Sequence, residues 1–90
     1  MSWDIVYSEK AVRTLAKIDK SNRDKILKWL DKNIVGSANP KAYGKSLAGN
    51  LSGLWRYRVG DYRILCEICD KELVVYVFAV GHRKNIYKGI

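Results

Sequence analysis

The spacing of hydrophobic residues changes along the chain, from a helical period in its first half to a strand period in its second. The opening WDIVYS predicts a short strand with Trp3, Ile5 and Tyr7 on one face. Ser8 is a residue type that caps helices, so a helix is expected from residue 9 to about residue 18. The apolar residues at helical spacing in this segment are Val12, Leu15 and Ala16.

A second helix is predicted to begin at SNRD, where Ser21 and Asp24 have the form of a capping box. We expect this helix to end at Gly36. Trp29 lies off the edge of its apolar stripe, which suggests contact with a partner. The stripe itself consists of Ile26, Leu27, Leu30 and Ile34. The two helices would form an αα-hairpin with a lysine-coated surface, contributed by Lys10, Lys17, Lys20, Lys25, Lys28 and Lys32.

Residues 37–53 have the composition of a loop, and a loop this long in a small domain usually has a function or covers a core edge. Beyond it, LWRYRV, DYRILCEIC and ELVVYVFAV predict three strands joined by tight turns at Gly60-Asp61 and Asp70-Lys71. The leading glycine of the first turn favours type II′. The expected fold is α+β in the order β-α-α-β-β-β. An antiparallel sheet packs against the αα-hairpin, and a short C-terminal helix or arm follows.

The net charge of the chain indicates what kind of molecule it binds. Ninety residues suit one domain over residues 1–90, and 17 lysines and arginines against 9 acidic residues give a net charge of +8. Such a charge attracts nucleic acid first, an acidic protein second and an anionic membrane third, although a basic composition alone does not identify a site. The sequence has no signal-peptide pattern and no stretch near the roughly 18 apolar residues of a membrane span. A cytoplasmic protein that does not bind membranes is therefore expected.

Three arginines are predicted to share one face of the first hairpin. If Gly60 and Asp61 form the turn, Arg58 pairs with Arg63, and Arg56 lies two residues further along the same face. We call Arg56, Arg58 and Arg63 the arginine face. Like charges directly opposite one another destabilise a sheet, so their pairing suggests a bound anion, and arginine suits phosphate. The alternative is a salt-bridge network with Asp61, Glu67 or Glu72. The opposite face would supply core residues: Trp55, Tyr57, Val59, Tyr62, Ile64 and Cys66.

The remaining reactive residues lie in the second hairpin strand and near the C-terminus. Cys66 and Cys69 spell C-x-x-C, but a strand places them on opposite faces, so reduced thiols and no metal site are expected. His82 is the one histidine, and an ordinary pKa of about 6.5 would suit proton transfer, although a lone histidine is more often a surface residue. Without a metal motif, phosphodiester cleavage would use attack by an RNA 2′-hydroxyl, with cations stabilising the phosphorane.

These motifs resemble the RelE/ParE toxin superfamily of toxin–antitoxin systems. The pattern L-x-G-x-x-x-G-x-W-R-x-R-x-G-x-Y-R spans residues 47–63, and the ending G-H-R-x-x-x-Y, residues 81–87, favours the RelE branch. The resemblance implies the microbial ribonuclease-like RelE fold. It also implies a ribosome-dependent endoribonuclease that cuts messenger RNA in the A site without a cofactor. The expected partners are the ribosome with its messenger and an acidic, partly disordered antitoxin.

The resemblance also assigns roles to individual residues. Arg63 matches the arginine on the scissile phosphate, Arg83 one that stabilises the transition state or protonates the leaving group, and Tyr87 the tyrosine that orients the messenger. Arg56 and Arg58 stand where the family often has lysines. Because arginine keeps a pKa above about 12, either this pair only binds phosphate while His82 or Tyr87 moves the proton, or cleavage is weak. The expected RNA-binding residues are Lys41, Lys45, Arg56, Arg58 and Lys84.

Two other functions stay open at this point. A ParE-like toxin would poison DNA gyrase by binding it, without hydrolysis, and would have little reason to carry Arg63, Arg83 and Tyr87 together. An inactive homologue that only binds RNA or the ribosome would lose binding, and no cleavage, when its arginines are replaced.

Overall fold

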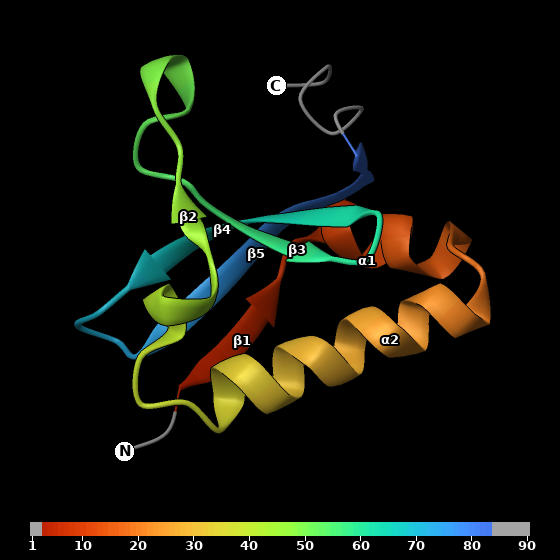
Figure 1. Cartoon of the computed structure of the whole chain (residues 1–90), viewed down its shortest axis with the longest axis horizontal. Coiled ribbons are helices and arrows are strands. Elements are labelled where there is room, and N and C mark those ends of the chain that lie inside the picture. Colours follow the sequence, from red (N-terminus) through yellow and green to blue (C-terminus); the bar gives the residue numbers. More distant parts are fainter. Residues whose placement is uncertain (1–2, 84–90) are drawn as a thin grey trace.

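Residues 3–83 of this computed structural model form one five-stranded sheet, in the order β1-β5-β4-β3-β2, with two helices packed on one face (Figure 1). The strands are β1 (Asp4–Tyr7), β2 (Lys45–Ser46), β3 (Trp55–Val59), β4 (Tyr62–Cys69) and β5 (Val74–His82), and the helices are α1 (Glu9–Lys17) and α2 (Lys20–Leu30). Three short helical segments complete the described chain: η1 (Asp31–Val35), η2 (Pro40–Tyr43) and η3 (Gly49–Leu51). Within these residues no helix is long and apolar enough to cross a membrane.

The prediction of an antiparallel sheet is wrong at one edge. β1 runs parallel to β5, with Asp4 opposite Val74 and Tyr7 opposite Val77, so the sheet is mixed. The strands from β2 to β5 pair antiparallel. Short turns force the antiparallel arrangement on β3, β4 and β5, although the second turn takes the four residues 70–73 and not the two predicted, since Cys69 pairs with Val74. Strand β1 is joined to the rest through two helices, which allows a parallel neighbour. The element order also gains β2, which lies inside the segment expected to be a loop.

Helix α1 begins as predicted, but a different stripe faces the core. The side chain of Ser8 accepts a hydrogen bond from the backbone N–H of Ala11 at 3.0 Å and donates one to the carbonyl of Phe78 at 2.8 Å. This anchor to β5 sets the rotation of the helix. Ala11 and Leu15 are buried, whereas Val12, predicted to face the core, is 54% exposed. Ala16 is also exposed.

The start of α2 corrects the predicted capping box. The cap is Asp19, whose carboxylate accepts hydrogen bonds from the backbone N–H of Asn22 at 3.1 Å and from its side chain at 2.9 Å. Ser21 lies inside the helix, because the carboxylate two residues earlier already accepts the free backbone N–H of Asn22 in the first turn. The helix continues as the π-helical turn η1 and ends at Gly36, as expected.

Aromatic packing ties the helices to the loop that precedes β2. Trp29, predicted to meet a partner, instead packs inside the protein, with ring centroids 5.4 Å from Tyr57 and 6.4 Å from Tyr43. The hydroxyl of Tyr57 is buried and donates to the carbonyl of Pro40 at 2.7 Å. The core also contains Trp3, Ala11, Leu15, Ile26, Leu30, Ile34, Val59, Ile64, Cys66, Val75, Val77 and Val80.

Candidate functional site

The first hairpin has the predicted register. Val59 pairs with Tyr62, Arg58 with Arg63 and Arg56 with Leu65. Gly60 has φ of +60°, and Asp61 is not among the described non-glycine residues with positive φ, as a type II′ turn requires. The core face of the hairpin is likewise confirmed, since Tyr57 and Ile64 are fully buried.

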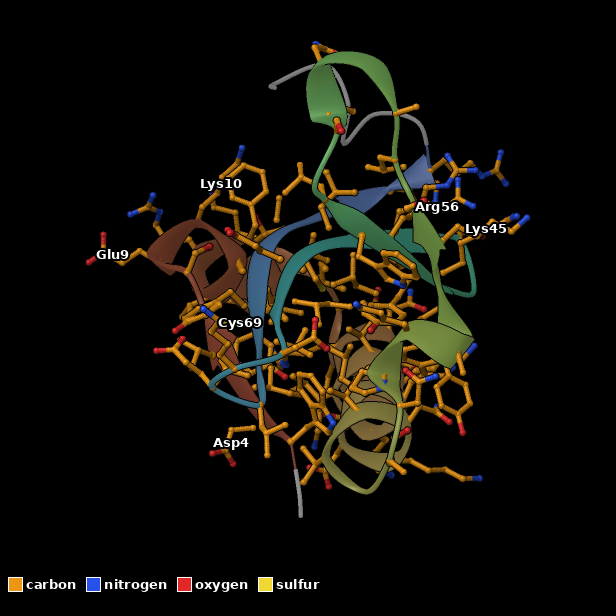
Figure 2. The ribbon with its side chains drawn as sticks, turned by 90° about the vertical axis from the view of Figure 1, so that its left-hand side faces the viewer. Asp4, Glu9, Lys10, Lys45, Arg56 and Cys69 are labelled. Atoms are coloured by element: carbon orange, nitrogen blue, oxygen red, sulfur yellow. The ribbon has the colours of Figure 1, made fainter. Side chains whose placement is uncertain are left out.

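The arginine face therefore lies on the side of the sheet away from the helices, and β2 extends it. Lys45 of β2 is the register partner of Arg56, so its side chain joins the same face. Arg58 and Lys45 are exposed, whereas Arg56 and Arg63 are half-buried. Figure 2 shows Lys45 and Arg56 on one side of the molecule and Glu9 of α1 on the other. The cations from three strands thus form one basic strip.

The salt-bridge alternative does not hold for two of these arginines. Within residues 3–83 the ion pairs join Arg13 to Glu9, Lys41 to Asp70 and Arg83 to Asp61, and none includes Arg56 or Arg58. The carboxylate of Glu72 instead accepts a hydrogen bond from the hydroxyl of Tyr76 at 2.8 Å. The charges of Arg56 and Arg58 are therefore available to an external anion.

A pocket opens at the edge of the arginine face and contains a residue that the sequence analysis did not single out. It has a volume of about 250 Å³ and is lined by Ala42, Tyr43, Gly44, Lys45, Arg56 and Arg58. Tyr43 is 48% exposed. The signal in the sequence is KAYGK, an aromatic residue between two lysines, which is a pattern of nucleic-acid-binding surfaces.

Gly44 holds the segment of Tyr43 against β3. A Cβ atom at this position would lie 2.5 Å from the carbonyl oxygen of Arg56 and 2.6 Å from Nε1 of Trp55. Because such distances are too short for any side chain, only glycine lets the backbone approach β3 this closely. The glycine therefore fixes the position of Tyr43 relative to Arg56.

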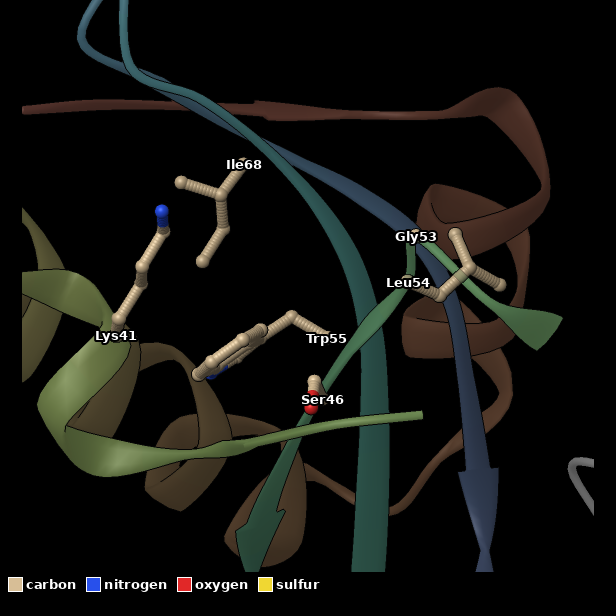
Figure 3. A pocket seen from close by; sticks show the side chains of 6 residues that line it. All are labelled: Lys41, Ser46, Gly53, Leu54, Trp55 and Ile68. Atoms are coloured by element: carbon tan, nitrogen blue, oxygen red, sulfur yellow. The ribbon is translucent and has the colours of Figure 1, made fainter. Parts of the chain in front are cut away.

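Lys41, expected to bind RNA, is not brought to the arginine face. Its amine lies 3.1 Å from a carboxylate oxygen of Asp70. Figure 3 shows Lys41 extending toward Ile68 above the ring of Trp55. These residues line a second pocket of about 220 Å³, together with Ser46, Gly53 and Leu54. Trp55 belongs to the core face of the hairpin, so this pocket and the pocket of Tyr43 open on different sides of β3.

His82 and Arg83, at the end of β5, lie in different surroundings. His82 pairs with Tyr62, and its ring lies edge-on to the Tyr62 ring at 5.3 Å, so it belongs to the helix side of the sheet, whereas Gly81 pairs with Arg63. Arg83 has φ of +51° and donates its backbone N–H to the carbonyl of Asp61 at 2.7 Å. Its guanidinium is 3.7 Å from the Asp61 carboxylate. Arg83 is thus held at the hairpin turn, whereas His82 lies on the side of the sheet opposite the arginine face.

Lys84 and Tyr87 lie outside the described residues, so their predicted places in the site stay predictions. Both cysteines are free thiols. Cys66 is buried in the core, and burial raises its pKa. Within residues 3–83 no group of three or more His, Cys, Asp and Glu side chains could hold a metal ion.

Comparison with known proteins places the chain in a family. Residues 5–87 match the family described as ParE toxin of type II toxin–antitoxin system, parDE. The chain belongs to this toxin family. It is also similar to Toxin RelG of Mycobacterium tuberculosis, with 38% identity over 52 residues, which cover 58% of this chain and 60% of that protein. The chain thus spans less than two thirds of this curated relative.

Solved structures confirm the fold. The toxin–antitoxin complex RelBE2 from M. tuberculosis matches with a TM-score of 0.79 and 25% identity, covering 92% of this chain and 100% of that one. A mutant of the E. coli toxin RelE in the free state matches with a TM-score of 0.75 and 22% identity, covering 98% and 93%. The resemblance to the RelE/ParE superfamily is confirmed, and these RelE-type relatives support its RelE branch.

Proposed function

We propose that this toxin is an endoribonuclease that cuts messenger RNA in the ribosomal A site. The observation that carries the proposal is the basic strip, in which Arg58 faces Arg63 across the hairpin and Lys45 faces Arg56 across the sheet edge. Three of these charges, those of Lys45, Arg56 and Arg58, have no ion-pair partner within the described residues. A surface that assembles like charges in this way suits the phosphates of a polyanion.

The proposed reaction needs no cofactor. The 2′-oxygen of one nucleotide attacks the adjacent phosphorus, the P–O5′ bond breaks, and the products are a 2′,3′-cyclic phosphate and a 5′-hydroxyl. Arg63 would bind the scissile phosphate, and Arg56, Arg58 and Lys45 would bind the backbone beside it. Guanidinium groups stabilise the extra negative charge of the phosphorane, which is where electrostatic catalysis contributes most.

Proton transfer falls to other groups, because arginine stays protonated. One proton must leave the 2′-hydroxyl and one must reach O5′. His82 and Tyr87 are the two candidates. His82 points its ring at Tyr62 on the helix side, so it must rotate away from that contact to serve. Arg83 would stabilise the phosphorane, and its exposed pair with Asp61 at 3.7 Å is weak enough to be exchanged for a phosphate.

An antitoxin is the second partner that we propose. The E. coli RelBE toxin–antitoxin complex has the same fold, with a TM-score of 0.71 and 19% identity, covering 93% of this chain and 100% of that one. The net charge of +8 suits an acidic partner that covers the basic strip. The proposed target also sets the compartment, since ribosomes are found in the cytoplasm.

The test is to add purified protein to programmed ribosomes and to map messenger ends by primer extension. Cuts at the A-site codon support the proposal. The matched family is named for ParE, so gyrase poisoning is the second candidate. Intact messenger together with gyrase-dependent DNA breaks would replace the first function by the second.

A further inference from the structure

Tyr43 is an exposed aromatic ring with a fixed position. The residue is 48% exposed, and its ring meets Trp29 edge-on, at a centroid distance of 6.4 Å and an interplanar angle of 86°. Trp29 in turn packs on the fully buried Tyr57. The hydroxyl of Tyr57 binds the carbonyl of Pro40, the first residue of the segment η2 that ends at Tyr43. The Tyr43 ring therefore packs against Trp29, and the hydrogen bond from Tyr57 to Pro40 connects the η2 segment to the core.

The surroundings of Tyr43 indicate what its free surface could contact. The same pocket of about 250 Å³ is lined by Lys45, Arg56 and Arg58, which have no ion-pair partner within residues 3–83. Proteins that bind single-stranded RNA combine cations along the backbone with aromatic rings on which bases stack. An acidic peptide would use the cations, but its carboxylates would not stack on the ring as a base does.

We propose that Tyr43 stacks on an unpaired base of the messenger, adjacent to a phosphate bound by Arg56 and Arg58. This inference rests on the proposed function and adds a base-binding position to it. Tyr43 touches the substrate away from the reacting bonds, so it positions the RNA and does not take part in the proton transfers. In this arrangement Arg56 and Arg58 bind the phosphate of a nucleotide, and the ring of Tyr43 stacks on its base.

The test measures binding to ribosomes programmed with short messengers whose A-site codon carries 2′-O-methyl groups, which block cleavage. In a parallel series, one base of the messenger at a time is replaced by an abasic site. Tyr43→Ala is expected to weaken binding of the intact messenger roughly 5- to 150-fold, the effect of one lost base–aromatic stack. One abasic position is expected to weaken wild-type binding by a similar factor and to leave Tyr43→Ala unchanged within about two-fold.

Three further variants separate stacking from support of the fold. Tyr43→Phe keeps the ring and should bind like the wild type, whereas Tyr43→Leu covers Trp29 without a ring and should bind like Tyr43→Ala. Tyr76→Ala removes another aromatic residue of similar exposure, 37%, whose hydroxyl donates to Glu72 and which does not line the pocket of Tyr43, so it should not alter binding.

Two results would overturn the inference. One is wild-type affinity in both Tyr43→Ala and Tyr43→Leu. The other is an equal loss at every abasic position in wild type and variant, which would leave Tyr43 as a cover for Trp29. Cleavage of the unmethylated messenger is scored separately. A protein that binds with the expected pattern but never cleaves would refute the proposed reaction and leave the stacking contact standing.

Discussion

Arg58 and Arg63 are direct register partners across the β3–β4 hairpin, so two side chains of the same charge leave the same face of the sheet one residue pair from the turn. Directly opposed like charges cost a sheet stability. The chain keeps the pair although threonine, a good strand residue, would fit this half-solvated face. Such an arrangement is expected where phosphate binding matters more than the stability of the free protein.

The first prediction follows from this pair. Arg58→Thr should raise the free energy of unfolding by about 0.2–1 kcal/mol, measured by urea denaturation at low salt. Because salt screens the repulsion, the gain should shrink as salt is added. A variant that is less stable than wild type at low salt would show that Arg58 is satisfied in the free protein.

A second prediction concerns catalysis. If the proposed reaction holds, Arg63→Ala and Arg83→Ala should each lower messenger cleavage on ribosomes about 100- to 1,000-fold and abolish growth arrest, because each would remove a proposed donor to the phosphorane. Arg13→Ala is the matched control, since Arg13 is an exposed arginine on α1 that pairs with Glu9. Circular dichroism checks that all three variants stay folded. Full toxicity in either of the first two would show that the residue lies outside the site.

Gly44 gives a third prediction, about the position of the pocket. Gly44→Ala should push the segment of Tyr43 away from β3 and destabilise the protein by about 1–3 kcal/mol, with weaker RNA binding. Gly36→Ala is the control, because a Cβ there meets its nearest neighbour at 3.4 Å and φ is −85°. Equal stability of the two variants would mean that the η2 segment can move away from β3 without lowering the free energy of unfolding.

The buried thiol of Cys66 makes a fourth prediction, about pH. Burial raises the pKa of Cys66, whereas an unfolded cysteine ionises near about 8.5. Above that pH the unfolded chain loses a proton that the folded chain keeps, so stability is present at neutral pH and falls as the pH rises. The slope should approach about 1.4 kcal/mol per pH unit for this one group. Denaturation between pH 8 and 9.5 should show a smaller slope in Cys66→Ala, and an unchanged slope would contradict the assignment.

The last prediction addresses the antitoxin. If the partner covers the basic strip, the affinity should fall as salt rises, mainly through slower association. Replacing Lys45 by glutamate should weaken the complex and flatten the salt dependence. Surface plasmon resonance at several salt concentrations measures both. An affinity that does not respond to salt would place the antitoxin on an apolar surface instead.

The parts of the fold that could be predicted from the sequence are those governed by local rules. The turn at Gly60 and the period of two fixed the hairpin register, and with it the pairing of Arg58 and Arg63. The parallel pairing of β1 with β5 joins segments about 70 residues apart and leaves no local signal. The rotation of α1 depends on the hydrogen bond from Ser8 to Phe78, a tertiary contact of the same kind.

The candidate site likewise has a part that could be predicted from the sequence and a part that could not. The arginine face follows from strand alternation, whereas the neighbourhood of Tyr43 depends on how a loop without periodicity folds onto β3. Lys41 shows what the sequence could not predict. In the sequence Lys41 and Lys45 look alike, but in the fold Lys41 pairs with Asp70. The side of the sheet taken by His82 was equally hidden, since the irregular register between β4 and β5 decides it.

Strand β2 closes the sheet beside β3 with two residues, one of which is Lys45. An open strand edge is a template on which another chain can add a strand, and proteins guard such edges with short strands and with lysine. The lysine that would hold a phosphate thus also guards this edge against self-assembly. Neutralising Lys45 would therefore expose the toxin to aggregation as well as remove a proposed phosphate contact.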